Sequence, residues 1–221
     1  MVKPRVVETD HGIQGSFTVA VYDQMQRAFR DRGWIETGNI IKHGITQGYA
    51  LEVGPGPGYL GLEWLKRTTG TRLKGLDISP DMIALAEKNA REYGLADRVE
   101  YVCSNAATMP FDDATFDAVF TNGSLHEWAA PRQIFDEIGG VLKPGGRVFI
   151  SDLRRDVSLP IRWFLWLGTT PKEIRPGLIT SLNASYTADE LRELIKGTRL
   201  AFCTVSSNLI GLTLFGNKPN Q

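Results

Sequence analysis

Short apolar runs alternate with helical patterns through the middle of the chain. Three stretches carry apolar residues at the three- and four-residue spacing of amphipathic helices: 59–68, 79–94 and 134–142. Five runs of strand length flank these helices, namely 51–53, 72–78, 99–103, 116–121 and 147–151. Strands that alternate with helices at this spacing form right-handed crossover units with parallel strands. The pattern predicts a doubly wound α/β fold with helices on both faces of a parallel sheet.

The pattern changes beyond Ala188. A helix is predicted over 189–196, and two short strands follow over 200–205 and 209–215, with only three residues between them. So short a connection permits only an antiparallel pair. We therefore expect a mostly parallel, seven-stranded, Rossmann-like sheet with an antiparallel C-terminal strand pair.

Two segments lie outside the predicted core. Residues before about 50 are mostly helical, and residues 156–187 are apolar and broken by prolines. Ligands of open α/β sheets bind beyond the carboxyl ends of the strands, so the second segment is well placed to form a lid. A helix packed on the core or a homodimer contact is the alternative. We interpret the chain as a single domain with an N-terminal helical cap, a cofactor-binding core, a lid-like insertion and a C-terminal helix with the strand pair: 1–48, 49–155, 156–187 and 188–221.

Charge and composition narrow the choice of partners. Lysine plus arginine number 25, as do aspartate plus glutamate, so no global field draws the chain toward nucleic acid or an anionic membrane. Cys103 and Cys203 lack the paired spacing of a zinc site, so we expect no metal and predict that both are buried apolar residues. Residues 1–5 lead into charged residues rather than an apolar segment, so we expect no signal peptide, and the apolar run 159–167 contains an arginine and is too short to span a bilayer. These features favour a cytoplasmic protein with no transmembrane segment and a small-molecule partner.

A glycine-rich loop follows the first predicted strand. Gly56, Gly58 and Gly61 have the spacing of the dinucleotide fingerprint, whose first glycine makes the turn directly after the strand. Here the residue directly after the strand is Gly54, two positions earlier. The alternative frame, in which Glu52 is followed by Gly54, Gly56 and Gly58, fits the strand end better. Glycine at such a turn lets the backbone approach a bulky ligand closely.

An ordered set of motifs resembles the class I S-adenosyl-L-methionine (SAM) dependent methyltransferases. Within them the chain is most similar to the small-molecule enzymes of the ubiquinone/menaquinone-biosynthesis type. The resemblance covers about residues 51–151, and the motifs that carry it are 51–58, 75–79, 105–111, 116–119, 124–128 and 142–146.

The resemblance implies SAM as cofactor and assigns residues to its parts. Asp77, which ends the second strand, can accept both ribose hydroxyls. Asn105 and Ala106 stand where the family binds adenine, commonly through an aspartate, and the amide oxygen of Asn105 can accept from the adenine amine. The remaining assigned residues would pack on the adenine ring, cradle the backbone of the ligand or hold its methionine end: Tyr22, Glu52, Gly54, Pro55, Gly56, Gly58, Ile78, Met82, Asn122 and Gly123.

The acceptor side of the site rests on a second group of residues. His126 follows the fourth strand, and we expect it to act as a base for a protonated acceptor and to line the acceptor site; its alternative role is to shape the pocket. Glu127 would orient it. Arg154 would hold an anionic substrate group, although Arg154 and Arg155 could instead form ion pairs with Asp152 and Asp156. Tyr186 completes the predicted substrate-binding set.

The sequence thus favours a methyltransferase that acts on a small molecule and releases S-adenosylhomocysteine. A [DN]-P-P-[YF] motif, which presents amines for methylation, is absent, and residues 122–125 stand in its place. An RNA or protein methyltransferase is the first alternative, although the chain has no basic tract. A nicotinamide-dependent oxidoreductase and a SAM-binding protein without catalysis are further alternatives, and a homodimer stays open.

Overall fold

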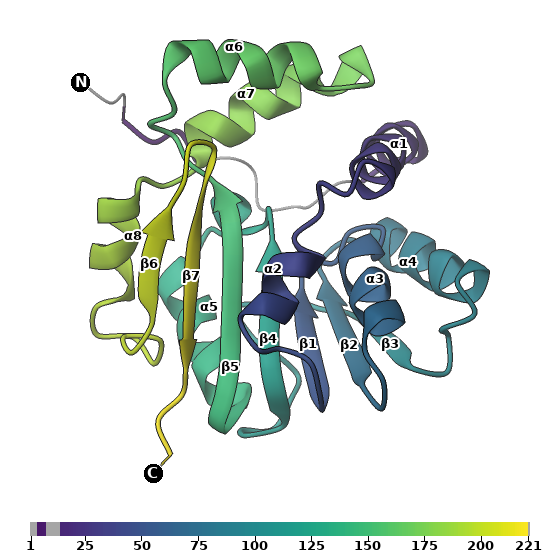
Figure 1. Ribbon diagram of the computed structural model, residues 1–221, viewed down its shortest axis with the longest axis vertical. Coiled ribbons are helices and arrows are strands. Elements are labelled where there is room, and N and C mark those ends of the chain that lie inside the picture. Colours follow the sequence, from purple (N-terminus) through teal and green to yellow (C-terminus); the bar gives the residue numbers. More distant parts are fainter. Residues whose placement is uncertain (1–3, 8–13, 221) are drawn as a thin grey trace.

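A single sheet forms the centre of the molecule (Figure 1). The computed structural model describes residues 4–7 and 14–220, and over this part of the chain seven strands follow one another in the order β3-β2-β1-β4-β5-β7-β6. β1 to β5 run parallel, whereas β7 runs antiparallel to β5 and to β6. The predicted fold class, with its antiparallel C-terminal pair, is confirmed. The strands are β1 (Tyr49–Val53), β2 (Arg72–Asp77), β3 (Val99–Cys103), β4 (Phe116–Asn122), β5 (Leu142–Leu153), β6 (Thr204–Ser207) and β7 (Gly211–Asn217).

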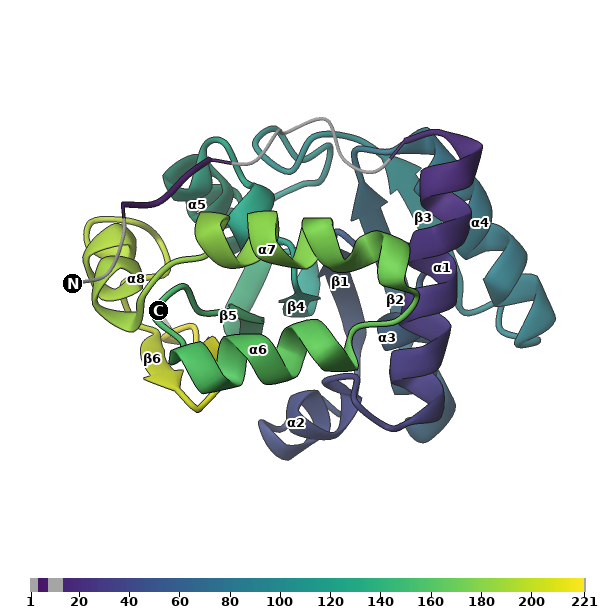
Figure 2. The same cartoon turned by 90° about the horizontal axis from the view of Figure 1, so that it is seen from above.

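Helices cover both faces of the sheet and its carboxyl edge. One face packs against α2 (Thr37–Lys42), α3 (Tyr59–Arg67) and α4 (Pro80–Glu92). The other packs against α5 (Pro131–Val141) and α8 (Ala188–Ile195). Figure 2 shows three further helices over the carboxyl ends of the strands: α1 (Ser16–Asp31), α6 (Leu159–Gly168) and α7 (Arg175–Ala184). Two 3-10 helices, η1 (Leu125–Glu127) and η2 (Lys172–Ile174), complete the described elements.

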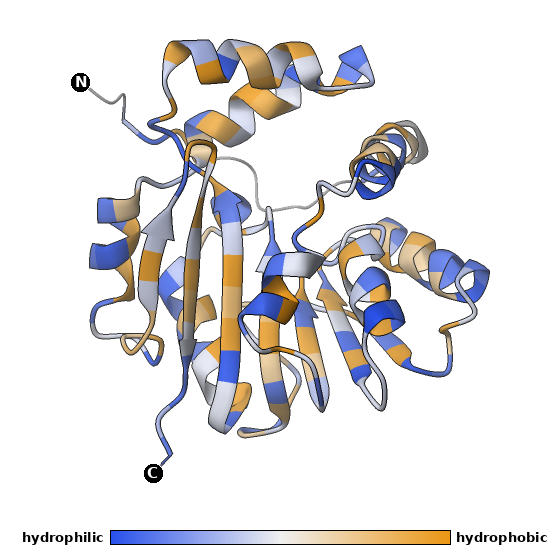
Figure 3. Cartoon of the chain, viewed as in Figure 1, coloured by the Kyte–Doolittle hydropathy of each residue, from blue (hydrophilic) through white to orange (hydrophobic). Residues whose placement is uncertain are grey.

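Two apolar clusters hold these layers together, one on each face of the sheet. Phe116 and Phe135 are fully buried on the α5 side, and Phe120 and Trp64 on the α3 side. The Trp64 indole also donates a hydrogen bond of 2.8 Å to the carbonyl of Ile45, so its polar atom is satisfied in the core. The orange bands on the strands in Figure 3 mark these apolar positions. None of the helices described here is long and apolar enough to cross a membrane.

Local caps fix where the helices that border the site begin. Ser79 accepts from the backbone N–H of Met82 at 3.2 Å, and Pro80 occupies the first turn of α4. The segment between β5 and α8 ends at a capping box, in which Thr187 and Glu190 each satisfy a backbone N–H of the other. α1 is attached to α3 through Tyr59, whose hydroxyl donates to Asp23 at 2.7 Å.

Three expectations from the sequence differ from the structure. The strand expected over 200–205 begins only at Thr204, as β6. β5 begins at Leu142, five residues before the predicted strand, because the register shifts between Phe116 and Ala118 and the irregular stretch accommodates Pro144. The prediction that both cysteines are buried is wrong for Cys103, which is exposed, and Cys203 is half-buried. Cys103 ends β3, which is an edge strand with a partner on one side only.

Candidate active site

A pocket of about 290 Å³ opens beyond the carboxyl ends of β1 to β4. Its centre lies where the strand order reverses, because β1 pairs with β2 on one side and with β4 on the other. Open α/β sheets bind ligands at this topological switch point. The pocket is lined by the ends of these strands and by single residues of α1, α4 and α5: Tyr22, Val53, Gly54, Gly56, Leu76, Asp77, Ile78, Met82, Ser104, Asn105, Ala106, Ala107, Gly123, Ser124, Glu127, Trp128, Ala129, Ala130 and Ile134.

The loop after β1 requires glycine at three alternate positions. Gly54, Gly56 and Gly58 have φ values of +66°, +53° and +85°, which L-residues rarely adopt. A Cβ on Gly54 would lie 2.2 Å from the hydroxyl of Ser124, and one on Gly58 would lie 2.7 Å from the hydroxyl of Tyr101. A Cβ on Gly56 would instead meet only Tyr22, at 3.5 Å. Gly54 and Gly58 therefore let the loop pack closely, and Gly56 turns its backbone toward the pocket.

Asp77 ends β2 directly beside this loop. Its carboxylate accepts from the backbone N–H of Gly56 at 3.0 Å and from that of Ser79 at 2.9 Å. Burial raises the pKa of Asp77, and the backbone N–H groups of Ser79 and Gly56 oppose that rise because they stabilise the charged form. The carboxylate is fixed in place and still faces the pocket.

Apolar residues also contribute to the lining. Ile78, directly after β2, and Met82 of α4 line the pocket, as do Trp128 and Ile134 from the segment after β4. Asn105 lines the pocket as well, but its side-chain oxygen already accepts from the backbone N–H of Ala107 at 2.8 Å. The arrangement suits a flat, apolar ring with polar edges.

Tyr22 extends the lining from α1. Its hydroxyl accepts from the side chain of Gln26 at 3.0 Å, and burial raises the pKa of this hydroxyl, with the nearby Glu127 carboxylate adding to the rise. α1 and the segment after β4 therefore face each other across the pocket.

Four residues of the predicted cofactor set lie outside the pocket lining: Glu52, Pro55, Gly58 and Asn122. Glu52 is 1% exposed beneath Gly61, whose added Cβ would lie 2.2 Å from Glu52 Oε2. Burial raises the pKa of Glu52 to about 8, and a hydrogen bond from the Gly61 backbone opposes the rise. Oε2 has no hydrogen-bond partner among the described residues. Asn122 accepts from the Ser151 hydroxyl at 2.9 Å and is exposed.

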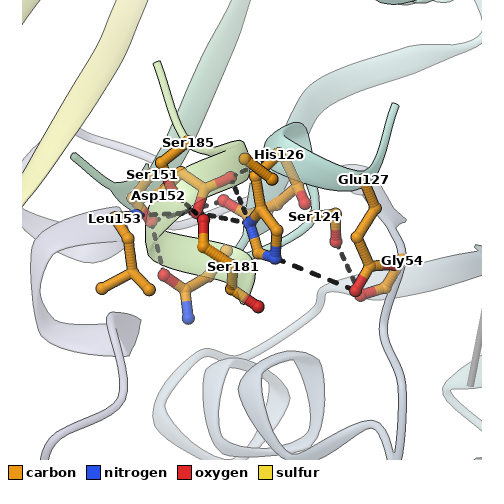
Figure 4. A network of polar contacts seen from close by, with 12 residues as sticks. Gly54, Ser124, His126, Glu127, Ser151, Asp152, Leu153, Ser181 and Ser185 are labelled. Atoms are coloured by element: carbon orange, nitrogen blue, oxygen red, sulfur yellow. Dashed lines mark hydrogen bonds and ion pairs between the residues drawn. The ribbon is translucent and has the colours of Figure 1, made fainter. Parts of the chain in front are cut away.

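His126 forms a buried pair with Asp152 next to the pocket (Figure 4). Its Nδ1 lies 2.8 and 3.0 Å from the two carboxylate oxygens of Asp152, and its backbone N–H donates to the same carboxylate at 2.8 Å. On the other side, His126 Nε2 lies 3.9 Å from Glu127 Oε1. With Asp152 as the acceptor, Nδ1 carries a proton, and Nε2 faces the Glu127 side. Glu127 itself lines the pocket, whereas His126 lies next to the pocket and is not part of its lining.

Arg154 and Arg155, which follow β5, make structural contacts. Arg154 makes two hydrogen bonds of 2.7 Å to Asp156 and one to the carbonyl of Asn208. Arg155 donates to the carbonyl of Ser185 and to Glu190. The alternative of a structural ion pair thus holds for Arg154 with Asp156, while Asp152 pairs with His126.

Tyr186 is also not part of the pocket lining, and the guanidinium of Arg5 lies 4.3 Å from the centroid of its ring. The same Arg5 donates to the carbonyl of His126 at 2.8 Å and to the carbonyl of Ala184. Residues 4–7 thus connect the end of α7 with η1.

The sequence analysis did not assign Ser124, Trp128 or Asp152 to the site. Ser124 and Trp128 belong to a motif that was recognised, and only the turn into η1 shows that they face the pocket. Asp152 lies 26 residues from His126 in the sequence, and the pairing of Asn122 with Ser151 in neighbouring strands brings them together.

The fold and the site together define a class of protein. A parallel sheet with an antiparallel edge pair, a glycine loop after β1 and an acid at the end of β2 are the features of Rossmann-like methyltransferases. The methyltransferase-domain family model matches residues 51–150. Residues 51–150 therefore carry a methyltransferase domain similar to the class I SAM-dependent methyltransferases, whose cofactor is SAM.

Individual relatives agree with this assignment. The chain is 35% identical over 103 residues to methyltransferase GfsG of Streptomyces halstedii, covering 47% of this chain and 37% of that protein. It is 30% identical over 102 residues to the ubiquinone/menaquinone biosynthesis C-methyltransferase UbiE of Roseobacter denitrificans, covering 46% and 41%. It therefore spans less than half the length of these relatives. The solved structure of a SAM-dependent methyltransferase from Aquifex aeolicus shares the fold, with a TM-score of 0.64, 19% identity and coverage of 83% and 89%.

Proposed function

We propose that this chain is an enzyme that transfers the methyl group of SAM to a small-molecule acceptor and releases S-adenosylhomocysteine. The observation that carries the proposal is the position of Asp77: its carboxylate is held by the loop that the three positive-φ glycines form, and it faces a pocket at the switch point of the sheet.

The residues of the pocket fit SAM from one end to the other. Asp77 would accept the ribose hydroxyls, and Ile78, Met82 and Ala106 would enclose the adenine. Asn105 would act through its side-chain NH₂ and the neighbouring backbone, since its oxygen is engaged with Ala107. Gly54, Gly56, Gly123 and Tyr22 would surround the methionine end.

Glu52, Pro55, Gly58 and Asn122 would support this site from outside the lining. A buried Glu52 with a pKa of about 8 is mostly protonated at neutral pH. We therefore assign it to the support of the glycine loop and not to an ion pair with the SAM ammonium. Pro55 and Gly58 belong to the loop itself, and Asn122 is linked to β5 through Ser151.

Methyl transfer depends mainly on alignment, because an in-line displacement gains most from holding its two reactants together. Bound SAM supplies a sulfonium methyl group, which the acceptor's lone pair takes while sulfur keeps the electrons of the broken bond. For an acceptor that carries a proton, His126 Nε2 would receive it. Asp152 would hold the ring in the required tautomer and stabilise the imidazolium that forms. Glu127 would orient the acceptor between Tyr22 and His126.

The helices that cover the site favour a small acceptor. α1 and α7 lie over the carboxyl ends of the strands (Figure 2), and α7 packs against η1, so the segment 156–187 would act as a lid. The relative UbiE, named for ubiquinone and menaquinone biosynthesis, supports an aromatic or quinol-like acceptor. The contacts that Arg154 and Tyr186 make in the structure would hold the two ends of the lid segment in place. A cytoplasmic location and a homodimer stay predictions, as does the exclusion of RNA and protein acceptors.

Calorimetric titration with SAM and with S-adenosylhomocysteine tests the cofactor. We expect both to bind the folded protein, and no binding by either one would refute the proposal. NADH, titrated in parallel, should give no heat.

Acceptor screening then tests the chemistry. Thiols, phenols, quinols and amines are assayed for S-adenosylhomocysteine production. With a phenol or quinol substrate, His126→Ala and Asp152→Asn should lower kcat by roughly 10²- to 10⁴-fold while SAM affinity stays within about threefold. Asp152→Asn should also shift the pH profile of kcat. His43→Gln, a histidine outside the site, is the matched control and should leave turnover unchanged. Full turnover by His126→Ala would remove the base role.

A further inference from the structure

The outer surface of α6 is apolar to an unusual degree for a helix that faces solvent. None of its ten residues is buried, and Leu159, Trp163 and Phe164 are 81%, 65% and 63% exposed. Trp166 and Leu167 are exposed as well. Figure 3 shows the orange bands of α6 at the outer end of the molecule, and Figure 2 shows α7 beside α6. An exposed apolar surface of this kind marks an interaction site.

The charge on α6 faces inward. Arg162 is the helix's only charged residue, and its guanidinium donates to Asn183 of α7 at 2.7 Å. A surface helix normally presents its charges to water and its apolar side to the core. α6 does the reverse, so its outward side is uncharged.

A second element extends the same surface. Leu209 and Ile210 form the tip of the β6–β7 hairpin and are 76% and 37% exposed. Figures 1 and 2 both show this tip beside the beginning of α6. The hairpin is attached there, since the carbonyls of Asn208 and Ile210 accept from Arg154 just before α6. The apolar surface thus comprises α6 and the hairpin tip.

The segment that contains α6 carries an excess of basic residues. Segment 157–185 contains three basic residues, Arg162, Lys172 and Arg175, against one acidic residue, Glu173, in a chain with a net charge of zero. Arg175 lies over the ring of Trp166, 4.4 Å from its centroid. Tryptophan, phenylalanine and leucine beside arginine and lysine are the composition of helices that lie in the interface of an anionic bilayer.

The size of the surface argues against a second copy as its occupant. A ten-residue helix is about 15 Å long and about 10 Å wide. With the hairpin tip it offers a few hundred Å², whereas a stable protein interface buries roughly 800 Å² on each partner. Insertion into lipid requires no matching surface of that size.

We propose that α6 and the tip of the β6–β7 hairpin dock the protein on the surface of an anionic lipid bilayer, with Trp163, Phe164 and Leu209 inserted among the lipids. The helix lies in the plane of the interface and does not cross it. Docking brings the segment that covers the candidate active site to the membrane, and the inference goes beyond the proposed methyl transfer.

Vesicle co-sedimentation of the full chain tests the docking. The probes are vesicles of phosphatidylcholine alone and of an equimolar mixture with phosphatidylglycerol. We expect binding that is at least tenfold tighter to the mixed vesicles and that weakens as salt is raised. Trp163→Ser combined with Phe164→Ser should weaken it by at least tenfold. Trp34→Ser is the matched control, because Trp34 is 59% exposed on a different part of the molecule, and it should leave binding unchanged.

A second variant separates depth of insertion from affinity. Trp163→Phe combined with Trp166→Phe keeps the surface apolar, so it should still sediment. Quenching of tryptophan fluorescence by brominated lipids, strong in the unmodified chain, should be largely lost in this variant. Unchanged SAM affinity and circular dichroism in every variant would show that the fold and the cofactor site are intact, so that docking and methyl transfer are judged separately.

Three results would overturn the proposal. The first is no sedimentation with either kind of vesicle, and the second is equal sedimentation of the Trp163→Ser and Phe164→Ser double variant. The third is a concentration-dependent dimer in analytical ultracentrifugation that this double variant abolishes, since a second copy would then cover the surface.

Discussion

Replacing Glu52 by Gln should make the protein more stable at neutral pH. The Glu52 carboxyl is buried beneath Gly61, and its pKa rises from 4.5 to about 8. Between these two values the folded chain holds one proton more than the unfolded chain, so the free energy of unfolding falls as pH rises. Each pH unit in this range removes about 1.4 kcal/mol. Relative to a permanently neutral side chain, burial of Glu52 therefore costs about 3 kcal/mol at pH 7 and on the order of 5 kcal/mol above pH 8.

Urea unfolding followed by circular dichroism, from about pH 5 to about pH 8, measures this difference. Glu52→Gln has no carboxyl to ionise and keeps an oxygen that can accept from the Gly61 backbone. Its advantage over the unmodified chain should be below about 1 kcal/mol at pH 5 and grow to about 3 kcal/mol at pH 7.

Glu100→Gln is the matched control. Glu100 is exposed on the edge strand β3, and its hydrogen bond and charge interaction with Lys74 lower its pKa. The Glu100 carboxyl is ionised in both the folded and the unfolded chain from about pH 6 upward. In this range the free energy of unfolding of Glu100→Gln should therefore differ from that of the unmodified chain by a constant amount. An advantage of Glu52→Gln that does not change with pH would refute the reasoning, because it would show that Glu52 titrates alike in the folded and unfolded chains.

Two further predictions concern the cofactor pocket. Asp77→Ala removes the acceptor assigned to the ribose hydroxyls, and the loss of two charge-assisted hydrogen bonds, about 3 kcal/mol together, should weaken SAM binding roughly 100-fold in calorimetry; a change below about threefold would place the ribose elsewhere. Gly54→Ala forces a Cβ to within 2.2 Å of the Ser124 hydroxyl at a φ of +66°, so SAM affinity should fall at least tenfold. Adding Ser124→Gly should recover part of that loss, and no recovery would mean that the collision is not its cause.

Local sequence patterns were enough to predict those parts of the fold that depend only on residues close together in the sequence. The glycine loop and Asp77 each follow a strand directly, and Ser79 with Pro80 marks the start of α4 within the same few residues. The connection of three residues before the last strand allowed only an antiparallel pair, and β6 and β7 form one. These features need no knowledge of distant contacts.

The remaining features depend on contacts between distant residues. Asp152 meets His126 only because β4 and β5 pair in one particular register. Glu52 follows the strand pattern, but only the position of Gly61 above it shows that the carboxyl is buried away from the pocket. Cys103 has the sequence of a core strand and is exposed because β3 lies at the edge of the sheet. A periodic pattern predicts which face of a helix or strand a residue occupies. It predicts neither the side chain that the residue contacts nor the order of the strands in the sheet.

The contacts of Arg5 affect where an affinity tag or a fluorescent label can be attached. Arg5 reaches the carbonyl of His126, so any group fused close before it would stand at the edge of the catalytic region and could displace the guanidinium from Tyr186. The other end of the chain is different: Lys218 accepts from the Gly145 backbone at the start of β5, at the end of the sheet away from the pocket (Figure 1). Purification tags therefore belong at the C-terminus. A dye placed beside Arg5 would instead lie next to the end of α7 and to η1.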